Sequence, residues 1–527
     1  MNQSSVHLLD LPDEMLLNIL KKLDNVDVLY ALLGIDSGRL NSLAREETFS
    51  RTLNLVSILH NTTMVDSILD RFFNYILPQV HDNVECLIVE PAFMERILLA
   101  AHYQNLTELK IINFQRDNSS RYFADDSSLR HIFKRQITKL DLFVKDRERE
   151  VGSLKDYTKN VFARVLTCFE NLNHLNVTGT MIPASPGLSI SYLPSNTFSS
   201  STLTYLCINV LYFTDCLCLL DGRLKHLSTF IVQIYCMDTD LSIVHNLNEL
   251  PKMKVFSLIH YGLIEEYNDK FVSLVRRMLY LEKLTLYLRI ACPSVYTDPI
   301  YLINEFSMNL SRLHSFNFYL STENNRNDLV RYLSNNNVKQ NYMNTGYQEV
   351  STIVSFSVNT ARHHIFTLPF EFIKFLGIGN IFPNIVFKNV IELYVHDVVP
   401  FEHEFFLRIA QAFPMLKRFC ISHLSRHSHN SKKSTDNIQS HQIVEYPHLT
   451  FLDITRVDNN YVEHLLNETK THLPSLTELH VRYEDLRVAT EDFTKELTRR
   501  NCANVTRLKT WREIVGSKDF YIYFPLL

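Results

Sequence analysis

The first fifty residues carry apolar side chains at the spacing of amphipathic helices. Leu16, Ile19, Leu20 and Leu23 stand at positions i, i+3, i+4 and i+7, which places them along one face of a helix. Pro12 stands just before this stripe, and a proline costs nothing at the first position of a helix, where its missing N–H has no partner anyway. The pattern therefore predicts a first helix that starts at Pro12.

Two further short helices are predicted by the same criterion. Asp24 is a residue type that caps helices, and a second helix is predicted over about residues 26–33, with Gly34 ending it. A third helix is predicted over about residues 37–47. The apolar faces of these helices are too large for so short a segment to bury alone, so we expect a further contact surface.

This segment resembles an F-box. The resemblance rests on Leu11-Pro12-x-Glu14, on the stripe that ends at Leu23, and on Asp27-Val28 at the start of the second helix; it covers roughly residues 6–52. In that family the motif binds a Skp-family adaptor protein, which couples the chain to a cullin-based ubiquitin ligase. The resemblance implies that the following residues form or support the adaptor-binding surface: Leu11, Pro12, Glu14, Ile19, Leu20, Leu23, Val28 and Leu32.

A second pattern, apolar-x-x-apolar-x-apolar, recurs through the rest of the chain. Its last two apolar residues alternate with another residue, as in a strand with one buried face, so each copy predicts a short strand. The fourteen copies begin at Val84, Leu106, Ile137, Leu172, Leu203, Leu227, Met253, Leu281, Leu313, Ile353, Val390, Leu416, Leu449 and Leu476.

Amphipathic helices are predicted before several of these copies. Ahead of the copy at Leu416, for example, Phe406, Ile409, Ala410 and Phe413 have helical spacing. The repeating unit is then helix, loop, strand, and strands joined by crossover helices must be parallel. One such unit cannot bury its apolar face alone, whereas stacked neighbours can.

The recurring pattern resembles a degenerate leucine-rich repeat array, whose period is about 20–29 residues. The implied fold class is α/β: an F-box of three helices over residues 6–52, and over residues 53–527 a solenoid with one curved parallel sheet inside and helices outside. The apolar tail Lys518–Leu527, with Trp511, is expected to cap the open end. Any alternating α/β fold would also show some copies of the pattern, which is the alternative.

The inner face of such an array is where we expect a protein substrate to bind. The residue between the last two apolar positions of each strand points to that face, as Tyr394 does, and so does the next outward position two residues later, where the other candidates lie. Tyrosine and arginine are frequent anchors of protein interfaces. On this basis the predicted substrate-binding residues are Tyr287, Tyr319, Tyr394, His396 and Arg482.

Composition and motifs argue against several classes of function. Lys and Arg number 53 against 57 Asp and Glu, so we expect no nucleic-acid surface. The chain has no phosphate-loop, dinucleotide or nucleophile-elbow motif, and we expect no catalytic residue. The nine cysteines lack zinc-pair spacing, and the segment 422–442, which is rich in histidine, is expected to be a polar loop, so no metal or cofactor is predicted. A Cys–His catalytic pair is not excluded by sequence alone.

Two function classes follow. The first is a non-catalytic substrate receptor of a Skp–cullin–F-box ubiquitin ligase; the alternative is a repeat-based interaction scaffold without a ubiquitin role. They differ in whether the Leu11–Leu23 stripe is exposed, because an exposed apolar stripe marks a binding site. An unrecognised enzyme would need a deep pocket with strongly shifted pKa values.

With neither a signal peptide nor a run of ~20 apolar residues, we expect an intracellular protein of the cytoplasm or nucleus, with no membrane partner.

Overall fold

A computed structural model of the chain describes residues 8–56, 70–115, 122–123, 127–145, 162–179, 189–191, 193–194, 197–238, 248–265, 270–292, 303–304, 306, 310–325, 349–357, 360–423, 442–457, 459–510 and 517–527. The fold is α/β, with mostly parallel strands. The chain divides into two compact units. Unit 1 comprises Met1–His260, Ser273–Lys283 and Leu310–Arg312, and unit 2 comprises Tyr261–Val272, Leu284–Asn309 and Leu313–Leu527.

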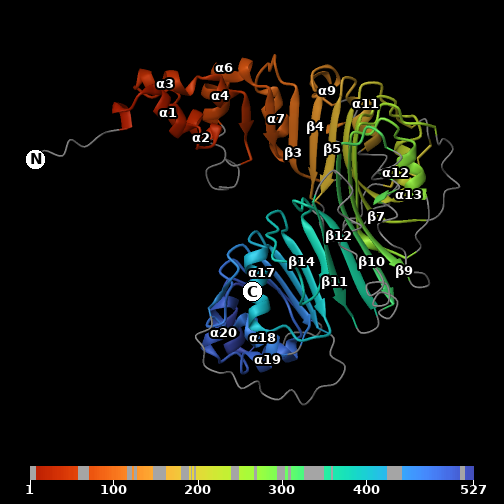
Figure 1. Ribbon diagram of the computed structural model, residues 1–527. Helices are drawn as coiled ribbons and strands as arrows, with labels where there is room; N and C mark the ends of the chain where they lie inside the picture. The colour runs from red at the N-terminus through yellow and green to blue at the C-terminus, as the bar shows by residue number, and fades with distance from the viewer. Residues whose placement is uncertain are drawn as a thin grey trace, which may run out of the picture. The chain divides into compact units, whose positions relative to one another are not determined.

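Short helices open unit 1. After a 3-10 turn at Leu8–Asp10 come α1 (Asp13–Leu20), α2 (Asn25–Leu32), α3 (Gly38–Ala44) and α4 (Glu47–Ser50), the red segments of Figure 1. The first two predicted helices are confirmed, except that Pro12 precedes α1 and is not its first residue. The third predicted helix is confirmed as α3, which ends three residues before the predicted end, and a further short helix, α4, follows after the chain turns at Arg45 and Glu46.

The helical segment α1–α4 packs against the chain that follows it. Asn25 donates its side-chain amide to the Thr52 carbonyl at 3.2 Å, and Arg71 donates to the Leu33 carbonyl at 3.2 Å. Gly34 has a φ of 81° and faces the ring of Tyr75 so closely that a Cβ atom would collide with it. The expected further contact surface is therefore supplied in part by the chain's own next segment.

A parallel sheet forms the body of unit 1, and its strands lie side by side in chain order (Figure 1). The helices described along it are η3 (Phe72–Ile76, a π-helix), α6 (Leu77–Val80), η4 (His81–Asn83, 3-10), α7 (Pro91–Leu99), α9 (Arg130–Arg135), α11 (Arg164–Cys168), α12 (Phe213–Leu219) and α13 (Lys270–Arg276). The strands are β1 (Thr52–Asn54), β2 (Cys86–Val89), β3 (Glu108–Phe114), β4 (Lys139–Val144), β5 (His174–Gly179), β6 (Tyr205–Tyr212), β7 (Thr229–Cys236) and β8 (Val255–Ile264).

The core of unit 1 is formed by the residues at the second apolar position of the recurring pattern, which stack on one another from strand to strand. These side chains are direct neighbours across the sheet and are fully buried. Stacking therefore buries an apolar face that a single strand could not bury alone. In order across β2 to β8 they are Leu87, Leu109, Leu140, Leu175, Leu206, Phe230 and Phe256.

Unit 2 contains two different sheet arrangements. β9 (Lys283–Cys292) and β10 (Ser315–Asn325) precede β11 (Glu349–Phe356) and β12 (Thr360–Leu368), and β12 pairs antiparallel with both β10 and β11. A separate six-stranded parallel sheet comprises β13 (Lys374–Ile378), β14 (Glu392–Asp397), β15 (Arg418–His423), β17 (Phe451–Arg456), β19 (Glu478–His480) and β20 (Arg507–Lys509).

The remaining elements of unit 2 are one short strand pair and five helices. β16 (Val444–Glu445) pairs with β18 (Thr471–His472) in a parallel two-stranded sheet. The helices are α17 (His403–Ala412), α18 (Asn459–Leu466), α19 (Tyr483–Ala489), α20 (Glu496–Cys502) and α21 (Lys518–Tyr523).

The prediction of a single parallel sheet is wrong. The copy at Ile353 lies in β11, which forms a hairpin with β12, because a short turn in which Ser357 N–H donates to the Thr360 carbonyl replaces a crossover helix. The copies from Val390 onward belong to the separate six-stranded sheet. The polar loop expected at residues 422–442 does not begin at residue 422, because β15 continues to His423. Residues 424–441 of this segment lie outside the described residues.

The C-terminal tail packs as expected. Phe520, Tyr523 and Phe524 place their rings 5.1, 5.7 and 6.4 Å from the ring of Phe493, in the loop between α19 and α20. Tyr523 also contacts the hydroxyl of Thr498. Trp511 lies outside the described residues.

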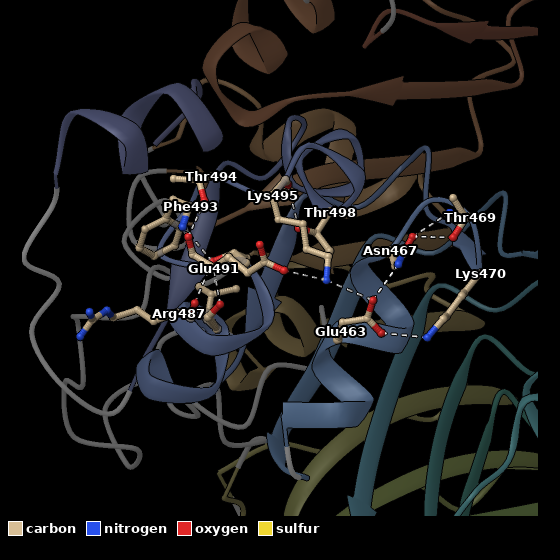
Figure 2. Close-up of polar contacts among 12 residues, drawn as sticks. Glu463, Asn467, Thr469, Lys470, Arg487, Glu491, Phe493, Thr494, Lys495 and Thr498 are labelled. Atoms are coloured by element: carbon tan, nitrogen blue, oxygen red, sulfur yellow. Dashed lines mark hydrogen bonds and ion pairs between the residues drawn. The ribbon is translucent and has the colours of Figure 1, made fainter. Parts of the chain in front are cut away.

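Polar contacts hold the same end together, with Glu463 of α18 at their centre (Figure 2). One carboxylate oxygen accepts from Asn467 at 2.7 Å and lies 3.5 Å from Lys495 Nζ; the other lies 2.9 Å from Lys470 Nζ. Burial by itself would raise the pKa of Glu463, but the donors Asn467 and Lys470 and the charges of both lysines outweigh it and lower the pKa.

Candidate functional site

The two faces of α1 differ in exposure. Leu16 and Leu20 are buried, as are the α2 residues Val26, Val28 and Leu29. Met15, Ile19 and Leu23 are exposed at 51%, 43% and 54%, with Leu9 at 48% just ahead of the helix. Met15 and Ile19 lie one turn apart on α1, and Leu23 follows three residues after the end of the helix; these three exposed residues are here called the α1 row.

Arg39 of α3 fixes the segment in front of this row. Its guanidinium forms an ion pair of 2.7 Å with Asp13 and donates to the carbonyls of Leu9 and Leu11 at 2.7 and 2.6 Å. Three contacts from one planar donor group fix where α1 begins. The α1 row is thus presented on a braced surface.

The predicted adaptor-binding residues separate into two groups. Pro12, Glu14, Ile19 and Leu23 are exposed, and Leu11 and Leu32 are half-buried. Leu20 and Val28 are buried and belong to the core beneath the surface. Met15 was missed by the sequence pattern, although its i, i+4 relation to Ile19 was the available signal.

The prediction that Tyr287 and Tyr319 lie on the substrate-binding surface is wrong. Tyr287 and Tyr319 are fully buried and stack with ring centroids 4.3 Å apart. The reason is the chain that follows β12: Phe372 packs edge-on against Tyr287 at 5.2 Å and Phe370 against Tyr319 at 6.0 Å. Strand alternation indicates which face a residue is on but not whether a later segment covers that face.

The other three predicted residues have different environments. His396 is 7% exposed, too little to anchor a partner, and its Nε2 lies 3.1 Å from Ser357 Oγ. Arg482 is exposed, but it pairs with Asp485 at 2.5 Å and donates to the Val457 carbonyl. Only Tyr394 lies in a concave site.

That site is a hollow of about 460 Å³ on the six-stranded sheet, here called the sheet hollow. Its floor is a row of neighbouring residues on successive strands, several of them among the expected inner-face positions. Its lining residues are Tyr394, Cys420, Ile421, Asp453, Thr455, Arg456, His480, Lys509 and Thr510.

The sheet hollow contains a cysteine and a histidine, the pair that sequence alone left open. Burial, with the charges of Asp453 and Glu392, raises the pKa of the Cys420 thiol to about 12, so it is not a thiolate near neutral pH. His480 Nε2 lies 2.8 Å from a carboxylate oxygen of Glu478. Asp453 accepts from the hydroxyl of Thr455 at 2.7 Å. These groups are arranged for structure rather than for nucleophilic attack.

A buried Ser–His–Tyr cluster elsewhere in unit 2 has the wrong proton arrangement for nucleophilic catalysis. Ser355 Oγ donates its single proton to the Gly377 carbonyl at 2.8 Å. His364 Nε2, 3.0 Å from Ser355 Oγ, must therefore donate to it, and His364 Nδ1 accepts from Tyr319 at 2.8 Å. Burial lowers the pKa of His364 well below its ordinary value, and nearby arginines add to this effect. His364 is a neutral structural group and not the base of Ser355.

Comparison with known proteins gave no match. No family model matches the chain, and no curated protein is significantly similar to it. Among the described residues there is no cluster of His, Cys, Asp or Glu able to hold a metal ion. Nor is any helix in the described ranges long and apolar enough to cross a membrane.

Proposed function

We propose that this chain is the substrate-recognition subunit of a Skp–cullin–F-box type ubiquitin ligase. In this proposal α1–α4 act as an F-box that binds a Skp-family adaptor, and through it a cullin. The sheets act as a degenerate leucine-rich-repeat array that binds a protein substrate. The chemistry of ubiquitin transfer lies on the other proteins of the complex, and this chain contributes binding alone.

The exposed α1 row is the observation that carries the proposal. Single exposed apolar residues are ordinary on a protein surface, but Met15 and Ile19 of α1, Leu23 just after it and Leu9 just before it are all exposed within one short segment, which is typical of a binding surface. Burying each such side chain contributes roughly 1–3 kcal/mol, so a partner that covers the row gains several kcal/mol. Ile19 and Leu23 of the row belong to the stripe that resembles the F-box motif, and Arg39 fixes the segment just before α1.

The bracing is a second support, because an adaptor site must be presented in one conformation. Asp24 caps α2 by accepting from the Val26 N–H at 3.0 Å, and Ser37 caps α3. Val28 and Leu29 of α2 are buried and so anchor this helix in the core. A preorganised surface spends less binding free energy on ordering.

The test is direct binding of the purified full-length chain to a purified Skp-family adaptor. The variant Ile19→Ser with Leu23→Ser removes two apolar side chains from the row without touching the core. The matched control is Leu279→Ser with Ile381→Ser, which changes two exposed apolar residues outside α1–α4. We expect affinity to fall at least tenfold in the first variant and to stay unchanged in the control.

The opposite result is equally clear. If the unaltered chain does not bind the adaptor, or if both double variants bind it equally, the proposal fails. The alternative, an interaction scaffold without a ubiquitin role, then explains the α1 row as a surface for another partner.

A further inference from the structure

The concave face of the six-stranded sheet carries two rows of side chains with contrasting electrostatics. The first row is internally paired: Glu392 lies 2.7 Å from Lys374, Glu478 lies 3.5 Å from Arg507, and the guanidinium of Arg418 stacks on Phe451 at 3.6 Å. In strand order this row is Lys374, Glu392, Arg418, Phe451, Glu478 and Arg507. The row holds three cations and two carboxylates, and Lys374, Glu392, Glu478 and Arg507 are paired within it.

The neighbouring row, which lines the sheet hollow, is different. Arg456 and Lys509 are exposed, and within the described part of the chain neither has an ion-pair partner. The Tyr394 hydroxyl likewise has no hydrogen-bond partner among the described residues. The hollow's carboxylate, Asp453, is already engaged by the N–H and hydroxyl of Thr455. Both of these bonds reach Oδ1 of Asp453, and its Oδ2 lies 3.9 Å from His480 Nδ1. The hollow thus presents donors and cations that no described residue uses, beside one carboxylate that is partly engaged.

From this arrangement we infer that the sheet hollow binds an anionic side chain of a protein segment, a carboxylate or a phosphate. Arg456 and Lys509 supply the charge, and Tyr394 supplies a neutral donor. Guanidinium and ammonium groups bind such oxygens through charge-assisted hydrogen bonds. A volume of about 460 Å³ is large enough for a side chain of either type. That the ligand belongs to a protein rests on the proposed function.

The test uses the full-length chain and a library of acetylated, amidated peptides. The central residue is Asp, Glu, phosphoserine, phosphothreonine, Asn, Gln or Lys, and the flanking positions are randomised. Fluorescence anisotropy on the best peptides then gives affinities for the unaltered chain and for Arg456→Gln with Lys509→Gln. The control, Arg499→Gln with Lys518→Gln, removes the same charges from α20 and α21.

We expect acidic or phosphorylated peptides to bind at least tenfold more tightly than their Asn and Gln counterparts. This preference should disappear in the Arg456/Lys509 variant and persist in the control. A charge-reversed variant, Arg456→Glu with Lys509→Glu, should instead prefer Lys-containing peptides. A phosphopeptide advantage over Asp and Glu identifies phosphate as the ligand; equal affinity identifies a carboxylate.

Absence of any acidic preference, or a preference that survives the Arg456/Lys509 change, overturns the inference. Adaptor binding is measured on the same preparations. If the adaptor does not bind while the acidic preference holds, the ligase proposal fails and the anion site stands. If the adaptor binds and the acidic preference is absent, the ligase proposal stands and the anion site fails.

Discussion

Arg39 of α3 and Asp13 at the start of α1 are joined by an ion pair of 2.7 Å, and the same guanidinium also holds the carbonyls of Leu9 and Leu11. An exposed ion pair alone contributes about 0–1 kcal/mol. Its effect here is geometric, because it fixes the segment from which the α1 row is presented.

The first prediction concerns this brace. Arg39→Gln should weaken adaptor binding about tenfold while lowering the free energy of unfolding by only about 1 kcal/mol, because the side chain is substantially exposed. Asp13→Asn, which leaves both carbonyl contacts in place, should have a smaller effect on binding. Calorimetric titration with the adaptor and urea unfolding measure the two quantities. Equal affinities for Arg39→Gln and the unaltered chain would refute the bracing role.

The second prediction separates surface from support. Leu29 of α2 is fully buried, so Leu29→Ala should lower the free energy of unfolding by about 2–5 kcal/mol and increase hydrogen exchange in α2. Leu23→Ala, at a 54% exposed position, should leave that exchange unchanged and reduce adaptor affinity. Hydrogen exchange monitored by mass spectrometry distinguishes the two. Faster exchange after Leu23→Ala would show that Leu23 is part of the core.

The third prediction concerns pH. Because burial lowers the pKa of His364, the unfolded chain binds a proton at this site that the folded chain does not. Its contribution to stability is therefore complete above the unfolded pKa of about 6.5 and declines below it, by at most about 1.4 kcal/mol per pH unit.

The comparison that isolates His364 is with His364→Gln. Urea unfolding at pH 7.5 and 5.5 should show a larger loss of stability for the unaltered chain than for the variant, which cannot take up that proton. Parallel pH dependence in the two proteins would mean that His364 is protonated in the folded state as readily as in the unfolded one.

The fourth prediction concerns the polar cluster of Figure 2. Glu463→Gln should lower the free energy of unfolding by about 1–2 kcal/mol near pH 7, since it removes the charge shared by Lys470 and Lys495. Because the pKa of Glu463 is lowered in the folded chain, its stabilisation is present above the unfolded value and is lost as pH falls through the folded one.

The same cluster permits a double-mutant cycle. Lys495→Gln combined with Glu463→Gln should be less destabilising than the sum of the single changes, and the difference between Glu463→Gln and the unaltered chain should shrink at about pH 4. Additive effects would show that the two side chains do not interact.

The sequence by itself determined which positions are apolar on each helix and strand. The pattern at Leu87, Leu109 and Leu140 predicted buried neighbours of a sheet, and the structure confirms them. The stripe from Leu16 to Leu23 likewise predicted α1, and Asp24 predicted the cap of α2. These features depend on residues a few positions apart, whose side chains point to one face through backbone geometry alone.

Only the tertiary structure decided which of those faces are covered. Tyr287 and Tyr319 have the strand alternation of surface residues, yet the segment after β12 buries them. Ile19 belongs to the same predicted apolar stripe as Leu20, yet Ile19 is exposed and Leu20 is buried. Exposure, pairing of charges such as that of Glu392, and the hairpin of β11 with β12 all depend on segments distant in sequence. Periodicity records only the local backbone, so it contains no information about which distant segment packs against a given face.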